Sequence, residues 1–141
     1  MKQTFTDEHD HLRVLIDSYL AMLRSHARPD IVDVMRRRLA FSNAFRAHVA
    51  AEGPVLDALR TGDRDHPTDR ILDQHSCRLR EVMPGYSALI HDWTPARIEA
   101  EWPDYCRDVR MQVKRYYEFL EWEEAQVLPL LGPGRAALSR A

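Results

Sequence analysis

The sequence has little of what builds β-sheets or crosses membranes. Only five glycines occur among 141 residues, and no segment alternates apolar and polar residues between turn signals, so strands are not expected. No run of about 18 apolar residues occurs, and no basic-then-apolar leader opens the chain. We therefore expect neither a membrane span nor a signal peptide.

The chain also has few cysteines and a small net charge. Cys77 and Cys106 lack the spacing of a metal or redox motif, so we expect both to be buried small side chains in a reduced, cytoplasmic protein. The net charge is −2 with both signs interspersed, which favours neither nucleic acid nor a membrane surface as a partner. A nucleophile beside a base and a phosphate-binding loop are also missing.

Apolar residues recur at alternating steps of three and four, which is typical of helices packed in a bundle. The pattern predicts four long helices, with these approximate bounds: Thr4 or Thr6 to Arg24, Asp30 (as cap) to Thr61, Pro67 onward, and Trp102 to Pro129. Residues 94–101 form a separate short piece. Pro84-Gly85 is expected to kink or break the third helix.

Short connections between these segments favour antiparallel neighbours. We therefore expect an all-α fold, an up-down-up-down four-helix bundle over residues 1–131, followed by a flexible tail over residues 132–141. His11, His26, His66 and His91 lie off the apolar seams or in turns, and we expect them on the surface.

Several polar residues interrupt the apolar seams, at least one in each long helix. They are His9, His48, Glu52, His75 and Glu123. Of the three neighbouring acids Glu121, Glu123 and Glu124, only Glu123 falls at a helix position that faces the interior. Because an unpaired buried carboxylate is very costly, such residues need hydrogen bonds, an ion pair or a metal.

The positions of these residues along the helices predict that they meet at one level. At about 1.5 Å per residue, Glu52 and His75 both lie roughly 13 Å from the turn between their helices. His48 and Glu52 are four residues apart, so they share a helical face. Imidazole with carboxylate suits iron, manganese or zinc, and two carboxylate-bridged metals about 3.5–4 Å apart would be a usual two-metal arrangement.

The pattern resembles the hemerythrin-like (HHE cation-binding) proteins. Four stretches in the family's order carry the resemblance: Glu8-His9-Asp10-His11-Leu12-Arg13, the His48-x-x-x-Glu52 pair, the His75 segment, and Trp122-Glu123-Glu124-Ala125-Gln126-Val127-Leu128-Pro129. The resemblance implies a di-iron site in which the three histidines His9, His48 and His75 are terminal ligands. It also implies that Glu52 and Glu123 are bridging carboxylates.

The chain departs from the family pattern at two positions. Phe119 stands where the family has its helix-four histidine, and Leu79 stands where classical hemerythrins have a second helix-three histidine. Reversible oxygen carriage is therefore not expected. Three outcomes stay open: Tyr116 or Glu124 supplies a replacement ligand, one metal binds with an open position that favours redox reactions, or the site has lost its metal.

The resemblance, together with the missing helix-four histidine, leads to two hypotheses about function. The first is a non-haem iron protein that senses, stores or handles dioxygen, peroxide, nitric oxide or iron itself. The alternative is a metal-free helical regulatory or interaction module that kept the scaffold, for which Phe119 is the reason. A mononuclear zinc site is a third, weaker reading, and an enzyme has no support beyond an open metal position.

Overall fold

The computed structural model describes residues 2–132, and this part of the chain is helical with no strand. The all-α prediction is therefore confirmed for the described residues. The helices are α1 (Lys2–Ser25), α2 (Ile31–Asp57), α3 (Pro67–Asp92), α4 (Pro95–Ala100), α5 (Trp102–Gln126) and the 3₁₀ helix η1 (Leu128–Leu131). Of the predicted tail, residues 133–141 lie outside the described part.

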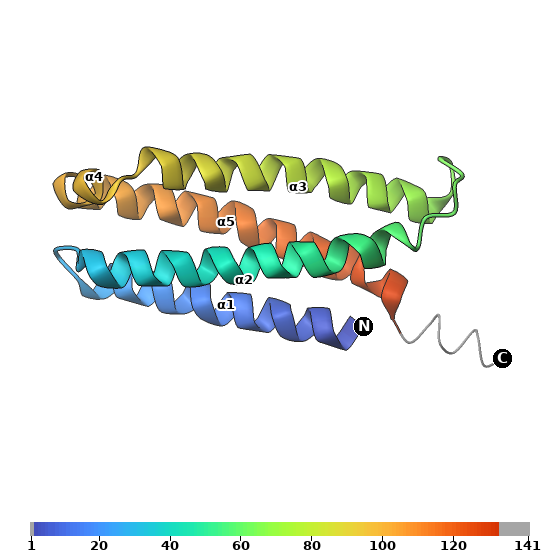
Figure 1. The fold of residues 1–141 in the computed structure, drawn as a ribbon, viewed down its shortest axis with the longest axis horizontal. Coiled ribbons are helices and arrows are strands. Elements are labelled where there is room, and N and C mark those ends of the chain that lie inside the picture. Colours follow the sequence, from blue (N-terminus) through green and yellow to red (C-terminus); the bar gives the residue numbers. More distant parts are fainter. Residues whose placement is uncertain (1, 133–141) are drawn as a thin grey trace.

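The long helices α1, α2, α3 and α5 lie along the long axis of the molecule, with their connections at alternating ends (Figure 1). α1 packs against α2 and α5, and α3 packs against α5. The short α4, which the sequence predicted as a separate piece, joins α3 to α5 at one end, and the α2–α3 turn lies at the other. None of the described helices is both long and apolar enough to cross a membrane.

Local signals account for most helix starts. The Asp30 side chain caps α2 by accepting from the Asp33 amide at 3.2 Å, as predicted, and Pro67 occupies the first turn of α3. The prediction that Thr4 or Thr6 caps the first helix is wrong, since α1 begins slightly before the expected start near these residues, at Lys2. The Thr6 hydroxyl donates back to the Lys2 carbonyl at 3.0 Å instead of capping.

The predicted end of the second helix at Thr61 is also wrong, because α2 ends at Asp57. Asp69, a buried carboxylate, accepts from the amides of Thr61 (2.9 Å) and Gly62 (3.2 Å). These bonds hold residues 61 and 62 in the turn rather than in the helix. Gly62 adopts φ +86° there, which glycine tolerates without steric cost.

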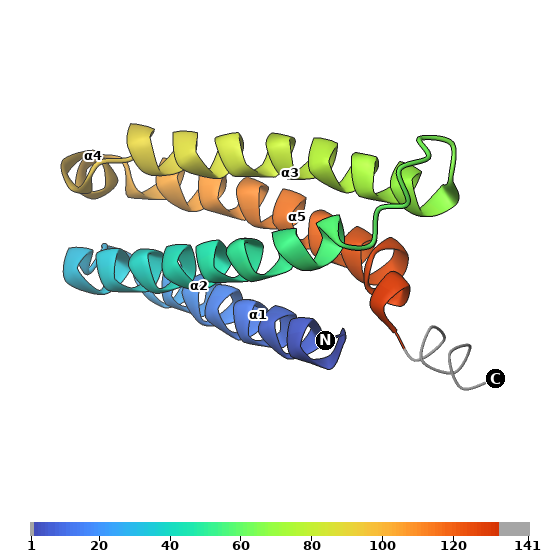
Figure 2. The same ribbon diagram turned by 45° about the vertical axis from the view of Figure 1, so that its right-hand side comes forward.

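The two helix-internal prolines behave differently. α3 continues through Pro84 to Asp92, so the helix is not broken there. The neighbouring Gly85 lets the Gln112 side chain of α5 approach closely, since a Cβ at position 85 would lie 3.2 Å from its Oε1. In α2, Pro54 removes a backbone donor, and the end of α2 leaves the line of the rest of the helix (Figure 2).

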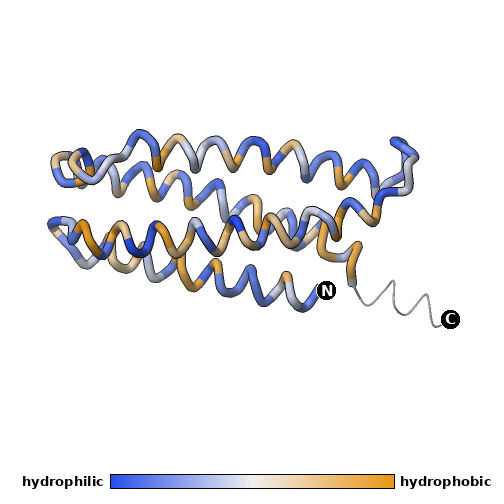
Figure 3. Tube along the Cα trace, in the orientation of Figure 1, coloured by the Kyte–Doolittle hydropathy of each residue, from blue (hydrophilic) through white to orange (hydrophobic). Residues whose placement is uncertain are grey.

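Apolar residues recur along each helix (Figure 3) and form three buried clusters, which we call the end core, the middle core and the turn core. The end core near α4 comprises Met22, Leu23, Val34, Trp93, Ile98, Trp102, Tyr105, Cys106 and Val109. The middle core comprises Leu12, Ile16, Phe45, Tyr116, Phe119 and Leu120. The turn core comprises Leu56, Leu72 and Val127.

The two cysteines differ from each other. Cys106 is buried in the end core, as predicted. Cys77 is exposed, so the prediction that it is buried is wrong. It lies two residues after the buried His75, and a step of two along a helix turns a side chain away from the face that packs.

Candidate metal centre

The five polar residues predicted on the seams are all buried and come from all four long helices. α1 contributes His9, α2 contributes His48 and Glu52, α3 contributes His75, and α5 contributes Glu123. His9 and Glu123 have no exposed surface, and His75 has the most, at 7%. They occupy the layer between the middle core and the turn core. The predicted surface histidines His11, His26, His66 and His91 are exposed.

Glu123 is the centre of this cluster. Its Oε1 accepts from His9 Nε2 at 2.7 Å and lies 3.4 Å from His48 Nε2, while its Oε2 accepts from His75 Nε2 at 2.7 Å. The neighbouring acids Glu121 and Glu124 do not share this burial. The helical phase of the run therefore predicted the correct residue.

Glu52 adds a second carboxylate to the same layer. Its Oε1 lies 3.1 Å from His75 Nε2 and its Oε2 lies 3.3 Å from His48 Nε2. The Oε2 contact lacks hydrogen-bond geometry, so this buried oxygen has no hydrogen-bond partner. The cluster therefore holds two carboxylates and three imidazoles whose Nε2 atoms all point inward.

The donor atoms fit a metal ion. Ligand atoms of His9, His48, Glu52 and Glu123 lie within 4.8 Å of one another. Ligand atoms bound to one ion at about 2.1 Å lie about 3.0–3.4 Å apart, close to the contacts observed. The Nε2 atoms of His9 and His48 face each other at 3.2 Å. An N–H on one of these nitrogens could donate to the lone pair of the other, and two lone pairs in this position could share a cation.

A second set of residues orients the imidazoles. His48 Nδ1 donates to Glu8 Oε2 at 2.6 Å, which holds the ring so that Nε2 faces the centre. A carboxylate on the outer nitrogen is a recurring feature of histidine ligands. Arg13 pairs with Glu124, whose Oε1 lies 3.8 Å from His9 Nδ1. The role of Glu8 in orienting His48 could not be predicted from the sequence, because the two residues are 40 positions apart in the chain.

The cluster shifts the pKa values of its members. Burial lowers the pKa of His48, but the nearby carboxylates of Glu123, Glu52 and Glu8 outweigh this and raise it to about 10. Burial and the same two inner carboxylates act on His75 in the same opposing way, and its pKa rises to about 9. Burial raises the pKa of Glu123, yet bonds from the three histidines hold it well below its usual range.

Phe119 is buried beside the cluster, with its ring centroid 5.7 Å from that of His75. Position 119 therefore lies next to the candidate ligands. The two suggested replacement ligands do not join the group of donor atoms described here. Tyr116 packs against Phe45 with ring centroids 5.0 Å apart and its buried hydroxyl has no partner, and Glu124 is paired with Arg13.

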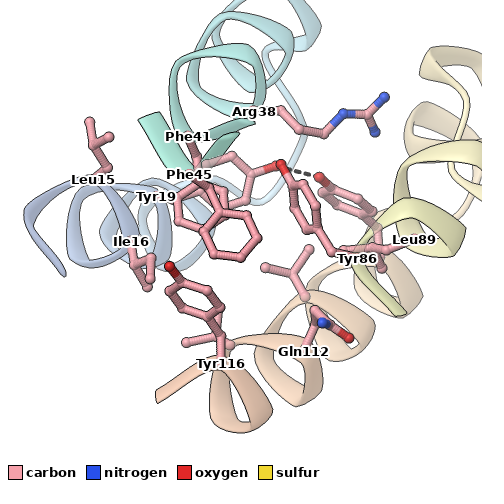
Figure 4. Close-up of a pocket in the computed structure, with 13 residues that line it drawn as sticks. Leu15, Ile16, Tyr19, Arg38, Phe41, Phe45, Tyr86, Leu89, Gln112 and Tyr116 are labelled. Carbon is pink, nitrogen blue, oxygen red and sulfur yellow. Dashed lines mark hydrogen bonds between the residues drawn. The ribbon is translucent and has the colours of Figure 1, made fainter. Parts of the chain in front are cut away.

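A separate apolar cavity of about 60 Å³ lies on the other side of the middle core. Figure 4 shows the rings around it, with Tyr19 from α1, Phe41 from α2, Tyr86 from α3 and Tyr116 from α5. Tyr19 is ten residues beyond His9, which at about 1.5 Å per residue is about 15 Å along the axis. No carboxylate or imidazole lines this cavity, so it lacks the ligand types of the candidate metal centre.

The side chains that could bind a metal therefore lie in one layer, to which each long helix contributes one or two of them. The buried His9, His48, Glu52 and Glu123 could hold a metal ion. His75 faces the same carboxylates from α3. In comparisons with known proteins, this chain matches no family model, no curated protein and no solved structure.

Proposed function

We propose that this chain is a hemerythrin-like non-haem iron-binding protein with an up-down-up-down four-helix bundle. In this proposal His9, His48 and His75 are terminal ligands, and Glu52 and Glu123 are the carboxylates that bridge two irons or hold one. The protein would sense, store or handle dioxygen, peroxide, nitric oxide or iron. The observation that carries the proposal is the convergence of three inward-facing Nε2 atoms on two buried carboxylates.

One unpaired atom of the cluster supports a metal over a purely hydrogen-bonded core. Glu52 Oε2 is buried without a hydrogen-bond partner, and such an atom costs about 1–3 kcal/mol when it stays unsatisfied. A cation between the carboxylates would bind the Glu52 oxygen directly. Glu8 would keep His48 Nε2 aimed at that cation through the bond to Nδ1.

Iron held by this set would supply one-electron redox chemistry and coordination positions for small ligands. The chain's own residues bind and shield it. The carboxylates neutralise its charge, and the middle core and turn core exclude water on the two sides along the axis. Binding would displace the protons that His48 and His75 carry, since ligand nitrogens must be deprotonated.

A second candidate is the metal-free regulatory or interaction module. The observation in its favour is that Glu123 already accepts hydrogen bonds from His9 and His75, so its charge is compensated by imidazoles alone. Phe119 fills the place of a further nitrogen ligand with an apolar ring. In this form the cluster would serve as a buried ion-pair network with no bound cofactor.

Elemental analysis and an absorption spectrum of protein expressed with added iron separate the two candidates. The iron hypothesis predicts about two irons per chain, or one for a mononuclear site, and a melting temperature that falls when a chelator removes them. His48→Ala should lose the iron, whereas His11→Ala, at an exposed position, should keep it. A wild-type protein without iron, with an unchanged melting temperature in chelator, would contradict the proposal. Bound zinc would support the mononuclear zinc reading.

A further inference from the structure

A cavity of about 110 Å³ lies between α2 and α3 directly beside the candidate metal centre. Its lining includes the buried Glu52 and His75, and it extends to Asp57 and Arg60. The Asp57 side chain is 78% exposed. The cavity therefore runs from two of the candidate ligands to the protein surface.

The α2 wall of this cavity is open because of its sequence. Gly53 lines it, and a Cβ placed on Gly53 would meet no atom within 4 Å. The next residue, Pro54, removes a helical hydrogen bond, and the end of α2 leaves the line of the rest of the helix (Figure 2). The missing side chain at position 53 leaves space next to Glu52.

The α3 wall offers no imidazole or carboxylate beyond His75. Leu79 also lines the cavity, and it lies four residues after His75, on the same helical face. Its apolar side chain leaves that position without a donor. The unpaired Glu52 Oε2 belongs to the residue that forms the cavity's inner end. A metal held here would therefore have its least protected side toward this cavity.

The α1 side of the cluster carries charged and polar side chains around a buried His9. His9 has no exposed surface, and the Arg13–Glu124 pair and the bond between Glu8 and His48 lie on that side. The aromatic cavity of Figure 4 includes none of the five candidate ligands. Of these routes, the space between α2 and α3 is the one that reaches the centre.

We propose that this cavity is the path by which small di- or triatomic ligands, of the class of nitric oxide, peroxide and azide, reach the metal, and that Gly53 keeps it open. The volume of the cavity is sufficient for such molecules. Arg60 at its outer part is paired with Asp73 at 2.8 Å, so the entrance does not select for anions. This inference rests on the proposed iron site.

Azide binding to the iron-loaded protein, followed by stopped-flow absorbance, tests the path. Gly53→Leu should slow azide association and dissociation by about tenfold or more, because its side chain occupies the open space. The azide Kd and the iron content should stay at the wild-type values. A damaged metal site would instead change both of these. Cobalt(II) uptake by the metal-free protein should slow in parallel, which gives a readout that needs no loaded iron.

Two further variants keep the test decisive. Gly53→Ala places a methyl group in the same space and strengthens the helix, so it should fold and give a smaller slowing. Ala51→Leu adds the same bulk at an exposed position of α2 that does not line the cavity, and its rates should match wild type.

The outcomes separate the two proposals. If the wild-type protein binds iron and azide, and both Gly53 variants react at the wild-type rate, the entry path is wrong and the iron site stands. If wild-type protein takes up neither iron nor cobalt, the proposed function is wrong, and the proposed entry path is wrong as well.

Discussion

The two ends of the molecule are built from the same four long helices but hold different interiors. Near α4, the end core is aromatic and aliphatic, and its indole N–H groups are satisfied at the rim: Trp93 Nε1 donates to Asp108 at 3.0 Å and Trp102 Nε1 to the His26 carbonyl at 3.1 Å. Toward the α2–α3 turn, a layer of histidines and glutamates interrupts the apolar interior between the middle core and the turn core.

The comparison shows that the same spacing of buried helix positions can hold a hydrophobic core at one end and a cluster of buried charged groups toward the other. Both ends have residues at steps of three and four on the buried faces, so both present a face to the interior. At the α4 end this face contributes hydrophobic burial. At the other end it carries buried charges that stabilise only when paired. We therefore expect stability to depend on both ends and metal binding on one.

The largest effect is expected from Glu123→Gln, which removes the charge that three imidazoles face. Iron should be lost. The free energy of unfolding of the metal-free protein should fall by about 3–5 kcal/mol, since the remaining buried charges lose their partner. Urea unfolding and elemental analysis measure both changes. Glu121→Gln, at an exposed position of the same helix, is the control. Full iron content in Glu123→Gln would exclude Glu123 as a ligand.

In the end core, Ile98→Ala should lower stability without touching the metal. Ile98 is completely buried, and truncating such a side chain costs about 2–5 kcal/mol. Iron content per folded chain should equal that of wild type. Loss of iron in this variant at a temperature where it is folded would show that the two ends are coupled, against the division described above.

Glu8→Gln tests the orientation of His48. The glutamine amide oxygen can still accept a hydrogen bond from His48 Nδ1, but it carries no negative charge. Metal affinity should therefore fall about 10–100-fold, as for other outer partners of ligand histidines. Competition with a chelator of known affinity measures this change. Asp7→Asn, whose side chain bonds Gln3 and not the cluster, should leave the affinity unchanged.

The pH dependence of the metal-free protein should reveal the imidazole pairs. His48 and His75 have folded-state pKa values raised to about 10 and about 9, above about 6.5 for an unfolded chain. Their contribution is therefore complete below about pH 6.5 and is lost as pH rises through 9 to 10. The melting temperature should fall by several degrees over this range. A flat profile would contradict the pairing of these imidazoles with Glu52 and Glu123.

The smallest effect is expected from Tyr116→Phe. The Tyr116 hydroxyl is buried without a partner, so its removal should leave the free energy of unfolding unchanged or raise it by up to about 1 kcal/mol. Iron content should not change. If the variant instead loses iron or an absorption band, Tyr116 supplies a phenolate ligand after all. Denaturant unfolding and the spectrum of the loaded variant decide this.

Much of the site could be predicted because helical periodicity converts sequence position into direction and height. Glu123 was distinguished from Glu121 and Glu124 by phase alone, and His48 with Glu52 by their spacing of four. The level of Glu52 and His75 followed from counting residues to a shared turn. These inferences need only the fixed rise and rotation of a helix.

Other features could not be predicted because they depend on residues distant in the chain. The bond between Glu8 and His48 joins positions 40 residues apart. The early end of α2 follows from Asp69 binding the amides of Thr61 and Gly62. Cys77 belongs to a residue type that is often buried, yet its side chain is exposed on α3.

The amino-acid sequence by itself determined that the chain is helical, where its long helices lie to within a few residues, and which polar side chains point inward. Local geometry suffices for these properties, since each is a periodic property of a single helix. Only the tertiary structure decided which nitrogens meet which oxygens, that Glu8 orients His48, and that a cavity at Gly53 reaches Glu52. These depend on how helices pack, and packing distances are set by side chains from different elements at once.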